Sequence, residues 1–246
     1  MLVGTADPRA LADGAPSLAD FGAQPLTLEG VETLQIVCEL EREGADALLP
    51  PGLHPTIPPI ATWLVQRVPA SPWGAFHLAQ FRVGCRSGLR PRGFLRAGVI
   101  DEAKAAAELA ARWGYVLRPG SIRLERGYDR ISASVEVDGA SILAAALVDP
   151  MPLRPEDAYT VASIHLAHTP RGLRLLQVDP DHAVARAERG RPLLHAFDAE
   201  AWRSLAARPT TPVSALFTLS SLTLPRLRYA CRPEVLAFEG TERVDA

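Results

Sequence analysis

The alternation of apolar and polar residues predicts a chain built mainly of β-strands. Residues 31–41 show it clearly, because Leu34, Ile36 and Cys38 fall on one side of an extended chain and Gln35 and Glu39 on the other. The same reasoning predicts strands at 60–68, 75–85, 94–100, 121–127, 130–138, 140–148, 160–169 and 173–178, and a strand or a mixture of helix and strand over 211–233. Proline and glycine pairs separate these segments, as turns do.

One segment has the composition of a helix. Residues 101–114 are rich in alanine, Asp101 is placed as an N-cap, and Gly114 is expected to end the helix. Residues 1–30 have weak periodicity and are predicted to be a partly ordered N-terminal lead-in. No repeat or low-complexity linker divides the rest, so residues 31–246 are predicted to form a single domain of mainly β structure.

Composition narrows the class of protein. The formal net charge is -2, without a cluster of basic residues, which argues against nucleic acid as a partner. No apolar run approaches the roughly 20 residues that span a membrane, and the N-terminus has no signal-peptide pattern, so we expect a cytoplasmic protein with no membrane partner. The cysteines Cys38, Cys85 and Cys231 lie in apolar surroundings, as reduced thiols do, and Lys104 is the only lysine.

The order of these elements, together with several local motifs, resembles the acetoacetate decarboxylase family. The motifs are Leu-Leu-Pro-Pro-Gly-Leu at 48–53, Gly-Ala-Phe at 74–76, the helix with its Trp-Gly-Tyr turn at 101–118, Leu-His-Ala-Phe-Asp at 194–198 and Thr-Pro-Val at 211–213. The resemblance implies an α+β, mainly β fold: a cone-like antiparallel β-barrel with flanking helices. It also implies a buried pocket for a small-molecule substrate and assembly into homo-oligomers.

The residues at the catalytic positions differ from the family pattern. The family attacks a ketone with a lysine, forming a Schiff base. Here Leu117 falls at that lysine and Arg118 at the second lysine, while Lys104 lies about 20 Å away along a helix. Leu78 falls at the pocket glutamate and Val31 at the substrate-binding arginine. We therefore expect a more apolar pocket and no Schiff-base chemistry.

Several polar side chains remain as candidates for the pocket. Arg118 is the first candidate, because a guanidinium can bind a carboxylate or stabilise an enolate; the alternative is a structural ion pair with Glu108 or Glu125. Tyr115 is a candidate proton donor and Trp113 a candidate pocket wall, although both residue types more often serve packing.

The strand at 75–85 supplies further candidates. Its alternation places Leu78, Gln80 and Arg82 on the face expected to line the pocket, and His77 on the other face. A register slip of one residue would reverse this and make His77 the catalytic acid or base.

Neither a metal nor a cofactor is predicted. His165 and His168 are three residues apart, which places them on opposite faces of a strand, and no phosphate-binding glycine motif is present.

The sequence thus predicts an acetoacetate decarboxylase-like enzyme that acts without a Schiff base on a carbonyl-bearing or enolisable small molecule. Lyase, hydratase or cyclase chemistry is expected, in secondary metabolism. The alternative is a related protein that binds a small molecule without catalysis.

Overall fold

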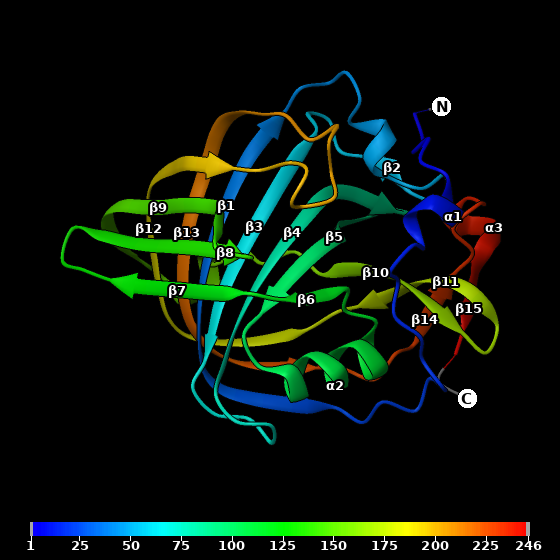
Figure 1. Ribbon diagram of the computed structural model, residues 1–246, viewed down its shortest axis with the longest axis horizontal. Helices are drawn as coiled ribbons and strands as arrows, with labels where there is room; N and C mark the ends of the chain where they lie inside the picture. The colour runs from blue at the N-terminus through cyan, green and yellow to red at the C-terminus, as the bar shows by residue number, and fades with distance from the viewer. Residues whose placement is uncertain (1, 245–246) are drawn as a thin grey trace.

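The strands form one extended sheet that curls around the main core (Figure 1). The computed structural model describes residues 2–244. The sheet has 15 strands, in the order β15-β14-β11-β10-β5-β4-β3-β1-β13-β12-β9-β8-β7, with β2 beside β4 and β6 beside β5. The strands are β1 (Leu26–Leu40), β2 (His54–Pro55), β3 (Ile60–Val68), β4 (Phe76–Ser87), β5 (Arg90–Ile100), β6 (Leu117–Pro119), β7 (Ser121–Arg126), β8 (Arg130–Val137), β9 (Ala140–Leu153), β10 (Ser163–Thr169), β11 (Gly172–Val178), β12 (Asp181–Phe197), β13 (Pro209–Leu224), β14 (Tyr229–Cys231) and β15 (Thr241–Arg243).

Helical segments are few and short. They are α1 (Pro8–Leu11), the 3-10 turn η1 (Asp46–Leu48), α2 (Ala103–Trp113), the 3-10 turn η2 (Pro155–Asp157) and α3 (Ala237–Gly240). Most neighbouring strands are antiparallel, but β5 pairs in parallel with both β6 and β10. The mainly β, α+β fold class predicted from the sequence is confirmed, although the sheet has two free ends and is not a closed barrel.

The two faces of the central strands bury different cores. On one face, Trp63, Phe81 and Phe197 form an aromatic cluster with ring centroids 5.0–5.3 Å apart, enclosed as β7 packs against β4 and β5. We call this face the inner face. The opposite face, here the outer face, packs against α2 through Leu109 and Trp113. Side chains therefore alternate between two separate environments along every central strand.

The helix α2 follows the prediction at its end but not at its start. Gly114 is the C-cap, with φ 71°, a left-handed conformation that favours glycine. The prediction that Asp101 is the N-cap is wrong. Glu102 caps the helix by accepting a hydrogen bond from the Lys104 backbone, and Asp101 instead accepts hydrogen bonds from the backbone N–H and ring of His77, at 2.6 and 2.7 Å.

The observed strands are mostly longer than the predicted ones. The strand β3 has the predicted bounds, whereas β1 begins at Leu26 and β9 continues through Asp149 and Pro150 to Leu153. Asp149 has φ 55° and lies at a register shift between β9 and β12. The Asp149-Pro150 pair, which is typical of a turn, instead forms an irregularity within the strand.

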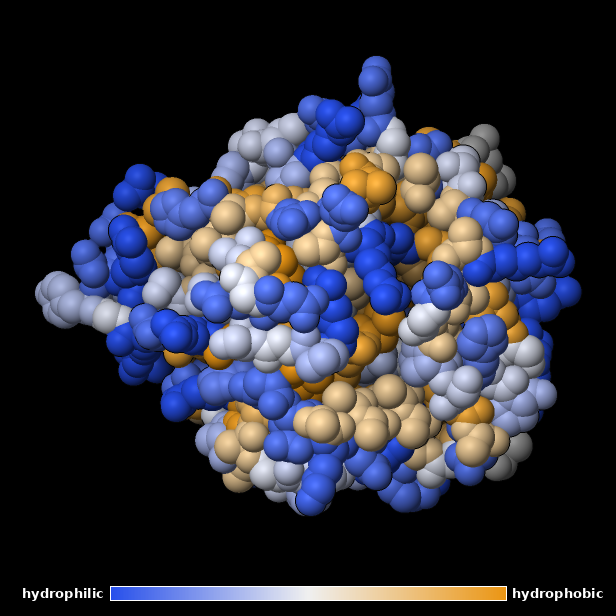
Figure 2. Space-filling model, in the orientation of Figure 1, coloured by the Kyte–Doolittle hydropathy of each residue, from blue (hydrophilic) through white to orange (hydrophobic). Residues whose placement is uncertain are grey.

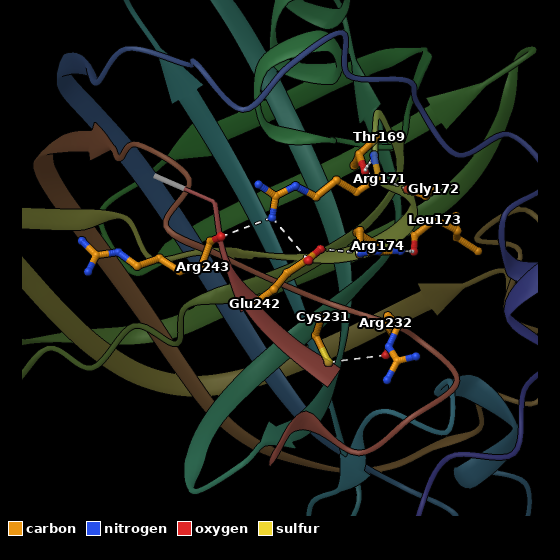
Figure 3. Close-up of polar contacts among 9 residues, drawn as sticks. All are labelled: Thr169, Arg171, Gly172, Leu173, Arg174, Cys231, Arg232, Glu242 and Arg243. Carbon is orange, nitrogen blue, oxygen red and sulfur yellow. Dashed lines mark hydrogen bonds and ion pairs between the residues drawn. The ribbon is translucent and has the colours of Figure 1, made fainter. Parts of the chain in front are cut away.

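The C-terminal segment is fastened to the hairpin of β10 and β11. Figure 3 shows Glu242, on β15, between Arg171 and Arg174. Arg174 Nε donates to Glu242 at 2.7 Å, and Arg171 lies 3.3 Å from the other carboxylate oxygen. These ion pairs join β15 to the hairpin that contains β10, a strand that contributes to the site described below.

We predict that replacing Glu242 by glutamine removes part of the pH dependence of stability. The two arginines lower the pKa of Glu242 below its ordinary value of 4.5, so its stabilising effect is complete above that value and is lost as pH falls through the lowered pKa. Urea unfolding of wild type and Glu242→Gln between about pH 3 and pH 7 measures this. The free energy of unfolding of the wild type should exceed that of Glu242→Gln by more at pH 7 than at the acidic end of the range. An equal difference in the free energy of unfolding at both ends of the range would contradict the prediction.

Candidate active site

A chain of buried polar side chains crosses the outer face of the central strands. Gln66, on β3, donates to Thr33 at 3.2 Å and accepts from Gln80, on β4, at 3.0 Å. Gln80 in turn accepts from Arg82 Nε at 3.0 Å and from a second Arg82 nitrogen at 2.6 Å. All four side chains are buried. Burial of so many polar groups is costly unless each has partners, which the chain supplies.

Arg82 brings a positive charge into this network without a negative partner. Its side chain is 6% exposed, and no acidic oxygen among residues 2–244 lies within ion-pair distance of it. Burial lowers its pKa, but a guanidinium remains protonated at neutral pH. Gly93 makes room for the side chain, since a Cβ there would lie 3.1 Å from Arg82 Cβ and Cδ. A buried, uncompensated cation of this kind is a suitable partner for an anionic ligand.

The segment that links η2 to β10 covers this polar chain. Val161 accepts a hydrogen bond from Arg82 at 3.1 Å through its backbone carbonyl. The Tyr159 carbonyl accepts from Gln35, a buried side chain on β1, at 3.5 Å. The covering segment is therefore held by main-chain oxygens and leaves the remaining Arg82 donors for other partners.

Tyr115 and His165 are close enough to Arg82 to interact with its charge. Their rings meet edge to face with centroids 4.4 Å apart, and both residues are buried. The Tyr115 hydroxyl makes no hydrogen bond within residues 2–244. Burial raises its pKa and the charge of Arg82 partly offsets this, so the phenol stays protonated at neutral pH.

The hydrogen bonds of His165 fix its tautomer. Nδ1 lies 2.7 Å from the Trp113 carbonyl, which can only accept, so Nδ1 carries the proton. Nε2 therefore accepts from the Ser163 hydroxyl, 2.8 Å away. Burial and the charge of Arg82 lower the pKa of His165 to about 3. The ring is neutral at pH 7 and holds the end of α2 against β10.

A cavity opens next to this network. Its volume is about 530 Å³, its walls include Glu156, Thr160, Asp181 and His182, and neither Arg82 nor any other member of the hydrogen-bond chain lines it. His182 pairs with Leu222 across β12 and β13 and so faces the outer side, and the charge of Arg82 lowers its pKa after the larger effect of burial. His182 Nδ1 and the hydroxyl of Ser220 are buried without a hydrogen-bond partner in the described part of the chain. Such atoms are candidates for binding a ligand or water.

Leu117 borders the polar chain, as its register shows. Gly98, on β5, pairs with Gln80 on one side and with Leu117 on the other. Paired residues project to the same face, and a Cβ at Gly98 would lie 2.5 Å from Leu117 Cδ2. Leu117 therefore covers Gly98 on the outer face beside Gln80.

The other predicted apolar positions lie on the same face. Val31 and Leu78 belong to the outer core with Trp113, whose indole donates to the Pro225 carbonyl at 2.7 Å. The structure thus brings together Val31, Leu78, Gln80, Arg82, Trp113, Tyr115 and Leu117, seven of the nine residues predicted for the site.

Arg118 lies elsewhere. It pairs with Val99, which belongs to the inner core, so the expectation that Arg118 and Leu117 line one pocket is wrong. One Arg118 nitrogen donates to the Ala201 carbonyl, and no acidic residue within 2–244 pairs with it, in contrast to the ion pair considered with Glu108 or Glu125.

His77 is also separate from the polar chain. It lies at the start of β4, on the face opposite Leu78, and pairs with Asp101. The alternation predicted from the sequence is therefore the observed one, and the slipped register is not. His165 is buried and His168 is exposed, and no group of three or more metal-binding side chains exists within residues 2–244.

Sequence reasoning missed several members of the network. They come from five different strands, and only the fold brings them together: Thr33, Gln66, Ser163, His165, His182 and Ser220. A usable signal was present in Gln66 and His165, polar residues within otherwise apolar strands.

Fold and site together define a mainly β protein with a buried polar network on the outer face of a curled sheet. The sequence matches the acetoacetate decarboxylase family over residues 13–216. The chain belongs to the acetoacetate decarboxylase family. No curated protein sequence matches, and no helix within residues 2–244 is long and apolar enough to cross a membrane.

Solved structures share the fold at low sequence identity. The acetoacetate decarboxylase of Legionella pneumophila is 20% identical, with a TM-score of 0.71 over 83% of this chain and 86% of that one. The enduracididine biosynthesis enzyme MppR, complexed with the condensation product of pyruvate and imidazole 4-carboxaldehyde, is 17% identical, with a TM-score of 0.69 over 85% and 90%. An acetoacetate decarboxylase-like enzyme from Sphingomonas wittichii RW1 is 16% identical, with a TM-score of 0.66 over 83% and 92%.

We predict that His165 makes the protein less stable as pH falls below neutrality. The unfolded chain binds a proton on this residue near its ordinary pKa of 6.5, whereas the folded chain does so near 3. Stability is therefore complete above pH 6.5 and falls by up to about 1.4 kcal/mol per pH unit below it.

Comparison of wild type with His165→Gln by urea unfolding between about pH 4 and pH 7 tests this. The variant should show a shallower loss of stability, and an identical slope would refute the assignment. His168→Gln, at an exposed position three residues along, is the matched control.

Proposed function

We propose that this chain is an enzyme of the acetoacetate decarboxylase family that acts without a Schiff base on a small carbonyl compound bearing a carboxylate. The observation that carries the proposal is Arg82, a buried cation without an acidic partner in the described chain, at the head of a fixed hydrogen-bond chain. A carboxylate would supply the missing negative charge and form charge-assisted hydrogen bonds.

The absence of Schiff-base chemistry is supported by the positions of two residues. Leu117, which falls at the family's catalytic lysine, has no nucleophilic atom and borders Gln80. Lys104, the only lysine, is exposed at the first turn of α2. Lys104 therefore lacks the apolar pocket that activates a catalytic lysine.

The remaining groups suit enolate chemistry. Arg82 would hold the carboxylate and stabilise negative charge that develops on the neighbouring oxygen. Tyr115, a protonated phenol with an unused hydroxyl, would donate a proton to the substrate carbonyl oxygen, and the neutral ring of His182, whose Nδ1 has no partner in the described chain, would take the proton from the neighbouring carbon. The apolar side chains of Val31, Leu78 and Leu117 would exclude water from the reacting carbons. Lyase, hydratase and cyclase reactions at the carbon next to a carbonyl group use such an enolate or its equivalent.

The class of substrate is suggested by a relative. MppR has been crystallised with pyruvate and with a condensation product of pyruvate. We extend this only to the chemical class, a 2-oxo acid, which combines the carboxylate that Arg82 requires with an enolisable carbonyl group. Assembly into homo-oligomers and a role in secondary metabolism remain part of the proposal.

We predict that the protein accelerates exchange of the methyl protons of pyruvate in D₂O, measured by proton NMR. Tyr115→Phe should slow the exchange by about 10²-fold or more while pyruvate still binds, because the proton donor is lost. Arg82→Gln should weaken pyruvate binding by about tenfold or more, because a charged hydrogen bond is worth about 1.5–3 kcal/mol.

The stability of the Arg82 variant provides a second measurement. Because Arg82→Gln removes an uncompensated buried charge, its free energy of unfolding should stay within about 1 kcal/mol of the wild type or exceed it. If pyruvate binds but does not exchange, the chain is a binding protein of this family, the alternative considered from the sequence. If 2-oxo acids neither bind nor exchange, the proposal fails.

We also predict that borohydride with acetoacetate leaves the wild-type protein unmodified, as judged by intact-protein mass spectrometry. Leu117→Lys, which restores an amine next to an apolar wall, should gain the mass of one reduced adduct. An adduct on Lys104 of the wild type would show that a Schiff base forms after all, and Lys104→Arg is the control for that site.

A further inference from the structure

A second cavity lies between α1, β5, β10 and the loop that precedes β13. Its volume is about 390 Å³, and its walls include Leu11, Phe94, Leu166 and the two arginines Arg96 and Arg203. Figure 2 shows this face of the molecule hollowed near its centre, where strongly hydrophilic residues border apolar ones. The cavity has no part in the proposed reaction, and none of its lining residues belongs to the Arg82 hydrogen-bond chain.

Arg96 enters this cavity from a bulge in β5. Leu95 and Ala97 pair with consecutive residues of β4, so Arg96 is the extra residue between them. Its Nε donates to the Ser204 hydroxyl at 3.3 Å and one terminal nitrogen donates to the Arg203 carbonyl at 2.7 Å. Burial lowers its pKa to about 10, which still leaves the guanidinium charged at neutral pH.

Arg96 is one of three arginines that gather here. Arg203 has φ 49°, a left-handed conformation that is strained for a residue with a Cβ, and donates to the Asp13 carbonyl at 3.5 Å. Arg118 approaches from β6 and donates to the Ala201 carbonyl, while its Nε is buried without a partner in the described chain. The charge of Arg203 lowers the pKa of Arg118, after the larger effect of burial.

Acidic residues do not neutralise this group. Asp138 and Asp198 raise the pKa of Arg118 less than burial lowers it, and Asp13, which also lines the cavity, is exposed and accepts from Arg203 through its backbone carbonyl. None of the three arginines forms an ion pair with an acidic residue of the described chain. Like charges gathered without acids repel one another, and an anion between them would relieve this repulsion.

We propose that this cavity is a second ligand site, which binds a small organic carboxylate. The guanidinium groups of Arg96 and Arg203 take the carboxylate, since their planar donors match its oxygens. Leu11, Phe94 and Leu166 contact the apolar body of the ligand. A volume of about 390 Å³ suits a small organic molecule better than an inorganic ion.

The second site is independent of the first by geometry. Arg82 donates to Gln80 and to the Val161 carbonyl, whereas Arg96 donates to Ser204 and to the Arg203 carbonyl, so the two arginines share no hydrogen-bond partner. Removal of Arg82 should therefore leave the second site intact, and removal of Arg96 should leave the first intact. The failure of one proposal does not entail the failure of the other.

The test is isothermal titration of the full chain with hexanoate, with hexanol as the uncharged analogue and inorganic phosphate as the anion without an apolar body. Hexanoate should bind the wild type, and Arg96→Gln should weaken this binding about tenfold, as expected for loss of a charged hydrogen bond. Arg203→Gln should weaken it in the same direction. Arg208→Gln, which removes an exposed arginine from the same loop, is the matched control and should bind normally. Arg82→Gln should also bind hexanoate normally.

Thermal unfolding of every variant establishes that it is folded. Equal hexanoate affinity in wild type and Arg96→Gln overturns the proposal, as does a dissociation constant for the wild type weaker than about 1 mM. Hexanol binding as tight as hexanoate binding would show that the arginines do not select the ligand. Phosphate binding as tight as hexanoate binding would show that the apolar wall of the cavity does not select the ligand either.

Discussion

The parallel pairing of β6 with β5 decides which side chains face which site. Leu117 and Arg118 are neighbours in sequence, and strand geometry sends them to opposite sides of the sheet. Gly98 makes the arrangement possible, because any side chain there would collide with Leu117. The same three-residue strand therefore closes the polar chain of Arg82 with an apolar side chain and delivers a cation to the arginine cluster. The geometry of both sites depends on this short pairing.

Arg82 gives the outer face its chemical character. A fully apolar residue could fill its position against Gly93 without the free-energy cost of burying a charge. Its three hydrogen bonds within residues 2–244 go to neutral acceptors, namely Gln80 twice and the Val161 carbonyl. These hydrogen bonds satisfy N–H groups of the guanidinium, but neutral acceptors do not compensate its positive charge. Burial and, after it, the charge of Arg82 lower the pKa of His165 and His182, and the same uncompensated charge favours an anion in this place. A site whose ligand supplies the missing charge is less stable without that ligand than an apolar core would be.

The sequence predicted more of the fold than of the site, for a physical reason. Strand alternation is a local signal, so it identified β3 with its observed bounds and placed Gln80 and Arg82 on the correct face. The strand β12 (Asp181–Phe197) was not predicted, because much of it is polar and solvent-accessible and lacks a regular apolar face. The Asp149-Pro150 pair was misread as the end of a strand, since a bulge and a turn use the same residues.

Prediction of the site residues would have required knowledge of the tertiary structure, for two reasons. Arg118 was assigned to the pocket because it falls at the family's second lysine, and only the register between β5 and β6 shows that its side chain and that of Leu117 lie on opposite faces. The residues of the network around Arg82 come from β1, β3, β4, α2 and β10, and no local pattern links them. The family pattern correctly marked Val31, Leu78 and Leu117 as positions on one face. It could not indicate that a cation absent from that pattern, Arg82, lies among them. The function of this chain therefore has to be argued from the charge that its own fold buries, and the family defines the scaffold on which that charge is held.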